Sequence, residues 1–386
     1  MTPPGRGLFP GERFRKGPLH NPDKGALPEA LRALLHSGAM EGGGVPSGAD
    51  PAAAAEALLA GGLVILPTET VYGLAGRADD PAAVARIYAA KGRPHDHPVI
   101  VHLGHPDSAL NVDAEGAWVA SVPDYARALA DDLWPGPMTL VLPRSARATD
   151  GITGGQDTVA IRVPAHPVAQ QVLTEMDARD PDGAPHGLAA PSANRFGRVS
   201  PTTLSHAMSE IADALDPTRD CALDGGVCGV GVESTIIDCT GEVPRILRPG
   251  GVTAGDIERV TGMRPEAGGG IRVPGALPSH YAPAATIVLA PDGEAAQAYA
   301  DAAAEAGLPA DRIAYLAPGE EPDIEGFSRL AAPSDASEYA RVLYSALRTA
   351  DSRDIALLVA VAPPADPDGI ATAVIDRLRR ASAPRA

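Results

Sequence analysis

A stretch rich in glycine and proline at residues 263–283 divides this chain of 386 residues into two segments. It contains three consecutive glycines, Gly268–Gly270, and several prolines, and such residues favour turns over helices and strands. A similar stretch occupies residues 1–48, interrupted by a short helical pattern over Pro28–His36. A chain of this length is expected to form two domains. The breaks predict an N-terminal extension (1–48), a first domain (49–262), a linker (263–283) and a C-terminal domain (284–386).

The first segment alternates between helical and strand-like sequence. Asp50-Pro51 and Asp80-Pro81 each predict the start of a helix, because aspartate caps free backbone N–H groups and proline fits the first turn. Short apolar runs of the kind that form buried strands follow. We expect strands at Leu63–Leu66, Val99–Leu103, Thr139–Leu142, Val159–Val163, Leu188–Ala190 and Ser234–Asp238, and further helices at Val168–Asp177 and Thr202–Leu215. The segment is therefore predicted to belong to the α/β class.

The C-terminal segment shows the same alternation on a smaller scale. Expected strands at Thr286–Leu289, Ile313–Leu316 and Ile355–Val361 are separated by expected helices at Glu294–Ala306 and Ala336–Thr349. Strands that alternate with helices in this way form parallel sheets. The pattern predicts a small Rossmann-like domain with a parallel sheet.

The formal net charge of −17 limits the partners that the chain can hold. An acidic protein repels nucleic acid and anionic lipid unless basic residues gather in one place. The longest apolar runs are too short to cross a bilayer, and no secretory signal follows the basic residues near the N-terminus. Three cysteines without C-x-x-C spacing fit a reducing compartment. We expect a soluble, cytoplasmic protein that does not bind membranes.

Common nucleotide-binding and hydrolase motifs do not occur in the sequence. It has no G-x-x-x-x-G-K-[ST] loop, no third glycine that would complete a dinucleotide fingerprint at Gly229–Gly231, and no G-x-S-x-G or H-E-x-x-H. Instead, short polar clusters occur at the ends of expected strands. Ligands bind at such strand ends in open α/β sheets. These clusters therefore form the candidate site.

Two of the clusters carry hydroxyls and cations. The motif PTETVYGL at 67–74 places two threonines and a tyrosine after a strand, where they can hold a small polar ligand. A threonine-rich turn accounts for the same residues. Lys91 and Arg93 stand in the turn KGRP, where paired cations suit a phosphate or a carboxylate. Compensation of a helix dipole is the alternative for this pair.

Four of the ten histidines, His95, His97, His102 and His105, lie close together in the sequence. They do not predict zinc, because no cysteine is near and prolines interrupt any regular ligand spacing. His102 falls inside an expected strand and therefore points to one face of the sheet. We interpret it as a single hydrogen-bonding group, and we expect no metal site built from protein side chains.

Arg162 lies within the apolar run VAIRV and cannot be buried there without an anion as its partner. The remaining clusters also stand at strand ends or in turns, namely WPGPMT (134–139), APSAN (190–194), Ser200, GVEST (231–235) and RILRPG (245–250). Together the clusters supply cations and hydroxyls without an evident nucleophile or base. That composition is typical of catalysis by positioning and charge stabilisation, as in transfer at phosphorus.

The order of these motifs closely resembles that of the YrdC-type threonylcarbamoyl-AMP synthase family. The matching segments are PTETVYGL, KGRP, PVIVH, WPGPMT, VAIRVP, APSAN, SPTT, VESTIID and RILRPG, and they extend over about Ala49 to Thr261. The segment PGALPSHYAP at 274–283 resembles the linker of the long form of the family, which carries an additional C-terminal domain. The resemblance implies a YrdC-like open twisted sheet for the first domain.

The resemblance also implies a reaction. Enzymes of this family condense L-threonine, bicarbonate and ATP, used with Mg²⁺, into threonylcarbamoyl-adenylate and pyrophosphate. This makes them nucleotidyltransferases. A partner tRNA threonylcarbamoyl transferase then modifies the adenosine next to the anticodon. For this chain the family implies attack of a threonine carbamate on the α-phosphorus of ATP. The acidic charge leads us to expect that direct tRNA binding is weak, if there is any.

Residue roles follow from the motifs that match the family. Five positions correspond to the L-threonine site, namely Thr70, His102, Arg162, Ala190 and Ser234, with Arg162 as the carboxylate clamp. The positions around ATP are Lys91, Arg93, Thr158, Ser192, Asn194, Ser200, Arg248 and Tyr281, with Thr235 as a further candidate in the same loops. Lys91 and Arg93 are the expected catalytic residues. His97 replaces an asparagine of the family and is a nucleotide-binding candidate.

The linker contains the pair His280-Tyr281 after a glycine-rich run. We expect it to fold over the nucleotide as a lid that excludes water, with Tyr281 on the ATP side; a packed linker tyrosine is the alternative. Two other functions remain at this point. One is an RNA-binding module, which the acidic charge disfavours. The other is a carbamoyl-transferase relative, which would carry acylphosphatase and zinc-finger-like segments that this sequence lacks.

Overall fold

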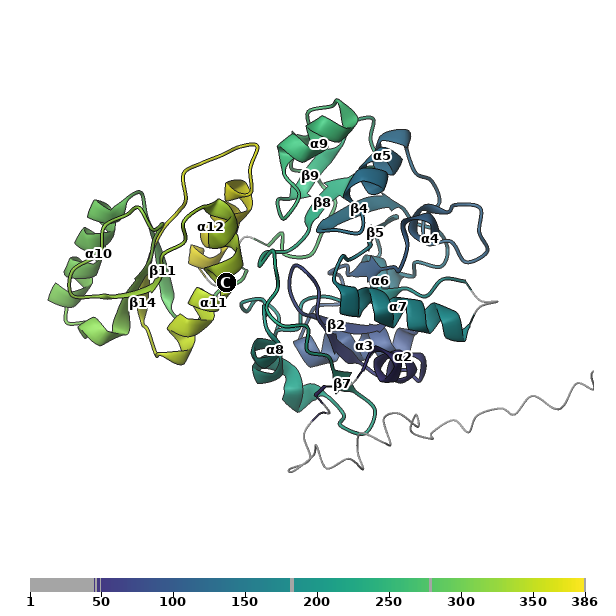
Figure 1. The fold of residues 1–386 in the computed structure, drawn as a ribbon, viewed down its shortest axis with the longest axis horizontal. Coiled ribbons are helices and arrows are strands. Elements are labelled where there is room, and N and C mark those ends of the chain that lie inside the picture. Colours follow the sequence, from purple (N-terminus) through teal and green to yellow (C-terminus); the bar gives the residue numbers. More distant parts are fainter. Residues whose placement is uncertain (1–44, 46, 49, 181–183, 278–279, 385–386) are drawn as a thin grey trace, which may run out of the picture.

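The computed structural model describes residues 45, 47–48, 50–180, 184–277 and 280–384. Nearly all of the N-terminal extension, including the helix expected over Pro28–His36, lies outside the described residues. Two α/β units lie side by side, and the linker runs between them (Figure 1). In the described residues no helix is long and apolar enough to cross a membrane.

The first domain contains a large mixed sheet. Its described strands have the order β10-β9-β8-β4-β5-β3-β6-β2-β1-β7. Their bounds are β1 Val64–Leu66, β2 Gly73–Arg77, β3 Ile100–His102, β4 Met138–Pro143, β5 Thr158–Arg162, β6 Leu188–Ala189, β7 Cys221–Ala222, β8 Thr235–Asp238, β9 Arg245–Arg248 and β10 Glu266–Ala267. The central strand β5 is parallel to β3 and antiparallel to β4, while β4 is parallel to β8. Strand β10 lies in the predicted linker, so the linker begins as an edge strand of this sheet.

Helices surround the large sheet and fix the loops at its strand ends. They are α2 Pro51–Leu59, α3 Pro81–Lys91, α4 Pro106–Leu110, α5 Asp124–Leu133, α6 Asp150–Thr153, α7 Pro167–Arg179, α8 Leu204–Ile211 and α9 Ala254–Thr261, with a 3₁₀ turn at Ala212–Ala214. As expected, Asp50 and Asp80 cap helices, accepting hydrogen bonds from the amides of Ala53 and Ala82 at 2.7 and 2.9 Å. Helix α3 ends at Gly92, whose φ of 61° is the left-handed conformation that suits glycine.

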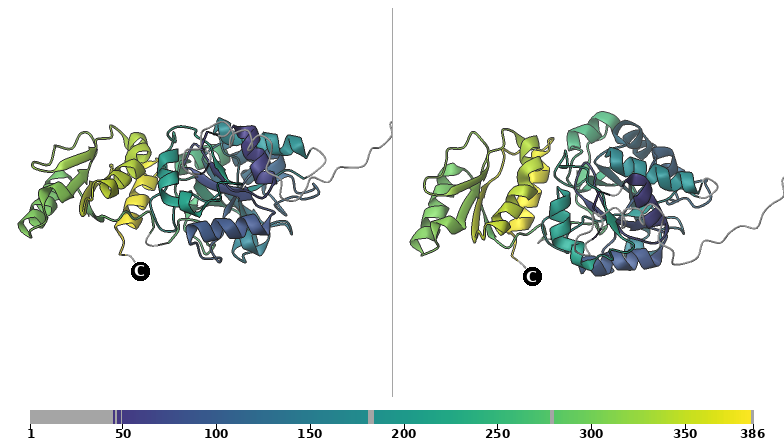
Figure 2. Two further views of the ribbon diagram at one scale, coloured as in Figure 1. Left: turned by 90° about the horizontal axis from the view of Figure 1, so that it is seen from below. Right: turned by 60° about the horizontal axis from the view of Figure 1, so that its bottom comes forward.

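The C-terminal domain is a smaller α/β unit. Strands β11 Thr286–Ala290, β12 Ile313–Leu316, β13 Ser328–Ala331 and β14 Leu357–Val361 form a sheet of order β11-β14-β12-β13. All its strand pairs are parallel, so the predicted parallel sheet is confirmed. Helices α10 Gly293–Glu305, α11 Ala336–Ser352 and α12 Ala371–Ser382, with a 3₁₀ turn at Ala310–Arg312, complete the domain. Helices α11 and α12 lie between the small sheet and the first domain (Figure 2).

The two domains share a packed boundary. One apolar cluster combines Val71, Val199 and Val232 of the first domain with Tyr281 of the linker and with apolar side chains of α11 and α12. The first domain keeps its own core around the large sheet. The C-terminal domain is therefore packed directly against the loops that follow β1 and precede β8.

The second half of the linker crosses one face of the large sheet. Val273 packs there against the apolar side chains of Ile100, Val141, Ala160 and Ile236. Polar contacts hold the segment in place: Arg248 donates from Nη1 to the Pro274 carbonyl at 2.9 Å, and the Ala282 amide donates to the Gly197 carbonyl at 3.1 Å. The linker therefore forms part of the wall of any pocket on this face of the sheet.

Candidate active site

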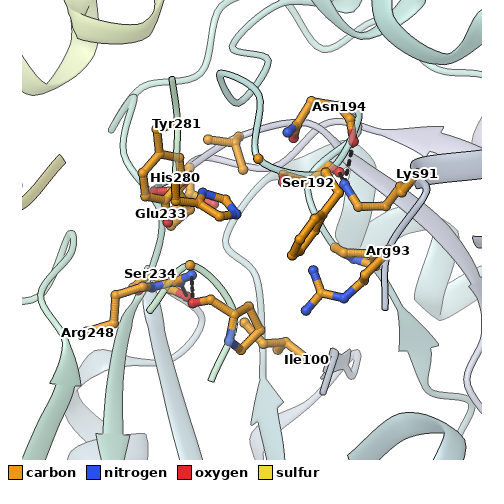
Figure 3. A pocket seen from close by; sticks show the side chains of 18 of the residues that line it. Lys91, Arg93, Ile100, Ser192, Asn194, Glu233, Ser234, Arg248, His280 and Tyr281 are labelled. Atoms are coloured by element: carbon orange, nitrogen blue, oxygen red, sulfur yellow. Dashed lines mark hydrogen bonds between the residues drawn. The ribbon is translucent and has the colours of Figure 1, made fainter. Parts of the chain in front are cut away.

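A pocket lies on the covered face of the large sheet, beside β3, at the ends of β5 and β9 and just before β8. Figure 3 shows the side chains that line it. Most of the residues predicted for the site line it, namely Thr70, Lys91, Arg93, His102, Arg162, Ala190, Ser192, Asn194, Ser234, Arg248 and Tyr281. Its free space is only about 50 Å³, because residues 274–275 and 280–281 of the linker close it from above. Sequence segments far apart in the chain therefore converge on one buried, cationic site.

Arg162 ends strand β5 and is buried, with 4% of its surface exposed. Its guanidinium is held by three acceptors: the Gly136 carbonyl at 3.3 Å, Thr70 Oγ1 at 3.0 Å and Glu69 Oε1 at 2.6 Å. The anion that its burial required is therefore Glu69, which was not among the predicted residues. These three contacts fix the plane of the guanidinium beside the pocket.

His102 and Ser234 lie on either side of Arg162. Strand pairing places His102 directly opposite Arg162 in the parallel β3–β5 ladder. Burial, reinforced by the Arg162 charge, lowers the pKa of His102 to about 3, so its ring is neutral. Ser234 Oγ forms a 2.7 Å hydrogen bond with Thr139 Oγ1 and accepts one from Arg248 Nη2 at 3.2 Å. The combination of a clamped arginine, a neutral imidazole and hydroxyls suits a small polar zwitterion.

Lys91 is the last residue of α3 and is buried, with 2% of its surface exposed. Its ammonium donates to the carbonyls of Ser192 and Asn194, the second at 2.5 Å, which ties α3 to the loop after β6. Burial lowers the pKa of Lys91 well below its ordinary value. Two neutral carbonyls do not balance a buried ammonium, so this position favours an anionic ligand.

Arg93 lies beside Lys91 and is also buried. Its Nη2 donates to the Pro98 carbonyl at 2.6 Å, and its guanidinium carbon lies 5.9 and 5.7 Å from the ring centres of Tyr88 and Phe196. Burial lowers its pKa below the ordinary range. Arg248 approaches from the opposite wall, so these three cationic side chains and Arg162 border one small volume.

Four predicted residues do not line the pocket. His97 packs its ring edge-on against Phe196 at 5.3 Å, and Thr158 begins β5 at the end opposite Arg162. Thr235 Oγ1 donates to the Val252 carbonyl at 2.5 Å, which holds the loop before α9. Ser200 lies behind the pocket wall and donates to Glu233 Oε1 at 2.7 Å.

The structure adds carboxylates that the sequence analysis did not assign. Glu69 and Glu233 stand inside the motifs PTETVYGL and GVEST, so the motifs themselves were the available signal. Glu233 lines the pocket and accepts hydrogen bonds from two residues of the C-terminal domain, Tyr344 at 2.8 Å and Arg377 at 2.8 Å. The expected set of cations and hydroxyls was therefore incomplete, because two buried arginines, Arg162 and Arg377, pair with these carboxylates.

His280 and Tyr281 both face the pocket. The two rings meet at 4.2 Å, and His280 also meets Phe196 edge-on at 6.0 Å. Tyr281 has a φ of 62°, an unusual value for a residue other than glycine, and its hydroxyl has no hydrogen-bond partner among the described residues. Gly275 approaches it so closely that a Cβ at this position would overlap the Tyr281 hydroxyl. The linker is thus shaped to place this tyrosine in the site.

Fold and pocket together define a two-domain α/β protein with a buried pocket beneath the linker, and the charged lining of that pocket suits anionic and zwitterionic small molecules. Two family models match the chain. One, described as "Telomere recombination" and covering Sua5, YciO and YrdC proteins, matches residues 56–250; the C-terminal domain of threonylcarbamoyl-AMP synthase matches residues 252–383. The chain belongs to the threonylcarbamoyl-AMP synthase family, and the predicted family is confirmed.

Individual relatives agree over both domains. The chain is 37% identical to the threonylcarbamoyl-AMP synthase of Pyrococcus abyssi, over 83% of this chain and 91% of the relative. It is 35% identical to the threonylcarbamoyl-AMP synthase of Bacillus subtilis, over 84% of this chain and 90% of that relative. The crystal structure of P. abyssi Sua5 with L-threonine superposes with a TM-score of 0.74 at 34% identity, covering 88% of this chain and 97% of that one.

A second P. abyssi Sua5 structure, of a variant with an adjacent histidine and tyrosine replaced by alanine, gives a TM-score of 0.74 at 33% identity, covering 86% and 92% of the two chains. These similarities confirm the predicted combination of an open YrdC-like sheet with a smaller parallel-sheet domain.

Proposed function

We propose that this chain condenses L-threonine, bicarbonate and ATP into threonylcarbamoyl-AMP and pyrophosphate. Threonine and bicarbonate first give a carbamate and water. A carbamate oxygen then attacks the α-phosphorus of ATP, and the bond to the departing pyrophosphate breaks. No side chain becomes covalently attached, so the protein acts by holding the reactants and by stabilising negative charge.

One observation carries the proposal: the clamped Arg162 and the cations Lys91, Arg93 and Arg248 border the same pocket. A carboxylate on Arg162 leaves the amino end of an amino acid facing the centre of that pocket. A polyphosphate is the natural partner of the other three cations. The two substrates are therefore held with their reacting ends toward each other.

Threonine is assigned to the Arg162 side of the pocket. Arg162 would bind its carboxylate with the N–H groups that Glu69, Thr70 and Gly136 leave free. Neutral His102 and the backbone at Ala190 complete this side, with Ser234 between the two substrates. The threonine-bound structure of P. abyssi Sua5 supports an amino-acid site in this fold.

ATP is assigned to the side formed by Lys91, Arg93, Ser192, Asn194, Arg248 and Tyr281. Lys91 and Arg93 would neutralise the charge that develops on the phosphates as pyrophosphate leaves. Ser200 acts from behind the wall through Glu233. Thr158 and His97 lie outside the space that the pocket encloses, so they reach the nucleotide only if it extends along the sheet or if the linker opens.

Mg²⁺ is assigned to the substrate rather than to a protein site. The described residues contain no group of three or more His, Cys, Asp or Glu side chains that could hold a metal ion. The carboxylate in the pocket, Glu233, already accepts hydrogen bonds on both oxygens. The residues do not fit a resident metal ion, and Mg²⁺ is expected to enter bound to the phosphates of ATP.

The linker is proposed to act as a lid. Small-molecule pockets usually measure roughly 300–1,000 Å³, whereas the free space here is about 50 Å³. ATP can therefore enter only when the linker moves away, and closure afterwards would shield the mixed anhydride from water. His280-Tyr281 is the single His-Tyr pair of this sequence, and a His-Tyr pair is the position altered in one P. abyssi structure.

The product is proposed to pass to a tRNA threonylcarbamoyl transferase, since a mixed anhydride of this kind is labile. The net charge of −17 keeps the expectation that direct tRNA binding is weak. An RNA-binding role would instead produce tight, salt-dependent tRNA affinity without any need for threonine or ATP. A salt titration of tRNA binding separates the two.

Incubation of the chain with ATP, bicarbonate and each amino acid in turn tests the proposal. Pyrophosphate should be released with threonine, and more weakly with serine, because one methyl contact contributes roughly 1–3 kcal/mol of discrimination. Release with no amino acid, or equally with all of them, would overturn it.

A further inference from the structure

Glu233 joins the two domains at the wall of the pocket. Its carboxylate is buried, with 6% of the residue exposed, and it lies immediately before Ser234. Oε1 accepts from Ser200 Oγ at 2.7 Å, and Oε2 accepts from Tyr344 of α11 and from Arg377 of α12, both at 2.8 Å. One oxygen thus faces the first domain and the other faces the C-terminal domain.

Arg377 is the cation that balances this carboxylate, and it is completely buried. Its Nε bonds Glu233, its Nη2 donates to the Pro249 carbonyl at 3.0 Å, and its guanidinium carbon lies 4.9 Å from the centre of the Tyr281 ring. Asp376 pairs with the remaining nitrogen at 2.5 Å. A single side chain therefore spans two loops of the first domain and the lid.

Three of the groups that Arg377 contacts, Glu233, the Pro249 carbonyl and Tyr281, lead to the ATP side of the pocket. Glu233 holds Ser200, Pro249 follows Arg248, and Tyr281 is the lid residue itself. Tyr344 stacks on Tyr281, with ring centres 5.6 Å apart. By contrast, the side-chain hydrogen bonds of Arg162 and Thr70 on the threonine side go to Gly136, Glu69 and Thr68, all within the first domain.

We infer that Arg377 and Tyr344 are positioning residues of the active site, by which the C-terminal domain holds Glu233 and the closed lid in the geometry that ATP needs. This inference rests on the proposed function and deepens it. It gives the C-terminal domain a task in the reaction beyond covering apolar surface.

The Glu233–Arg377 pair is less well explained as a contact that only holds the two domains together. A buried ion pair is often no more stabilising than well-packed apolar residues, because both charges lose their hydration. Other ion pairs already join this domain to the rest of the chain away from the pocket, among them Arg264 with Asp368. The buried pair instead fixes the direction of a carboxylate within the pocket wall.

The test compares substitutions in the full chain with matched controls. Tyr344→Phe removes only the hydroxyl that bonds Glu233; Tyr339→Phe is its control, since Tyr339 lies on the same helix, is equally buried and donates instead to Val361 within its own domain. Arg377→Met removes the buried cation. Arg377→Lys keeps the charge but not the guanidinium, whose separate nitrogens contact Glu233, Pro249 and Asp376. Arg264→Gln is the control that breaks an exposed ion pair between the linker and the C-terminal domain.

The measurements are KM and kcat for ATP and for threonine, with threonine affinity by calorimetry and Tm for each variant. Arg377→Met is expected to lower kcat/KM for ATP about 10-fold to 100-fold, since a displacement near 1 Å can have that effect. Tyr344→Phe should lower it about fivefold, the worth of one hydrogen bond. Threonine affinity should stay within about twofold of the parent, and both controls should match the parent.

A double variant, Glu233→Gln with Arg377→Met, separates an effect on the geometry of the ATP site from an effect on the stability of the domain contact. Removing both charges relieves the unpaired buried carboxylate, so Tm should recover toward the parent while the ATP defect remains. If the ATP parameters recover together with Tm, or if Arg377→Lys and Tyr344→Phe match Tyr339→Phe, the inference is wrong. If the parent itself forms no threonylcarbamoyl-AMP, the proposed function fails first, and the positioning role fails with it.

Discussion

Arg162 Nη2 donates to Glu69 Oε1 at 2.6 Å, so the arginine at the end of β5 has a permanent anionic partner. Burial raises the pKa of Glu69, but the Arg162 charge and hydrogen bond outweigh it and hold the pKa below its ordinary value. Glu69 does not line the pocket, whereas Arg162 does. Glu69 therefore acts as a counter-ion that lies outside the pocket and orients the Arg162 guanidinium at the pocket wall.

Replacing Arg162 should damage the use of threonine far more than that of ATP. Arg162→Ala removes the proposed carboxylate clamp, and loss of one member of a buried charged pair costs about 2–5 kcal/mol, or roughly 30-fold or more in affinity. Calorimetry on the variant should show ATP affinity close to that of the parent. If ATP affinity is lost while threonine binding is intact, the assignment of Arg162 to threonine is wrong.

Glu69 variants test whether this residue orients Arg162 or competes with the substrate. Glu69→Ala should weaken threonine binding about 10-fold, because the guanidinium loses the acceptor that fixes its plane. Glu69→Gln keeps an acceptor oxygen and should have a smaller effect. Threonine titrations of both variants decide the point: tighter binding than in the parent would mean that Glu69 occupies the place of the substrate carboxylate.

Tyr281→Ala should lower the yield of adenylate and shorten the lifetime of the product, since the lid would no longer fill the space above the nucleotide. Tyr281→Phe is the matched control, because the hydroxyl has no partner among the described residues and the ring keeps its stacking. Product decay can be followed by chromatography after quenching the reaction. A tether without a lid function would give three proteins with the same yield and decay.

Two buried histidines should make the fold sensitive to acid. Burial lowers the pKa of His102 and of His280 to about 3, from an ordinary value of 6.5. The unfolded chain therefore binds more protons than the folded one between pH 6.5 and 3. The free energy of unfolding should fall in that window by about 1.4 kcal/mol per pH unit for each histidine.

Glu233 should add to this acid sensitivity below pH 4.5, because Arg377 and Arg248 overcome its burial and lower its pKa to about 2. Chemical denaturation at several pH values measures the slope. His280→Phe should reduce it by about one proton between pH 6.5 and 4.5. An unchanged slope in that variant would show that His280 does not titrate as the structure implies.

Local sequence patterns predicted much of the fold. Asp-Pro pairs marked α2 and α3 because capping and proline geometry act within one turn, and apolar runs located strands such as β12 at Ile313–Leu316. Strand β2, Gly73–Arg77, was missed because its two glycines are poor strand formers. Gly76 is nevertheless needed there, since a Cβ would meet Leu63 Cδ2 at 2.9 Å. That requirement comes from packing and is invisible in a local pattern.

The sequence predicted the part of the candidate site whose motifs lie at the ends of strands. Arg162 in an apolar run required an anion, but the sequence could not show that the anion is Glu69, 93 positions away. Arg377 lies 144 positions from Glu233, in a helix that the sequence analysis did not assign. Such partners are set by how the domains pack, so only the folded structure brings them together.

The central claim is that one pocket joins threonine, bicarbonate and ATP, and omission of single substrates tests it most directly. The full chain is incubated with ATP, threonine and isotopically labelled bicarbonate, and both pyrophosphate and labelled nucleotide are measured. We expect pyrophosphate release only when all three substrates are present, in a one-to-one ratio with a labelled threonylcarbamoyl-AMP. Equal pyrophosphate release without bicarbonate, or a nucleotide product free of label, would contradict the claim.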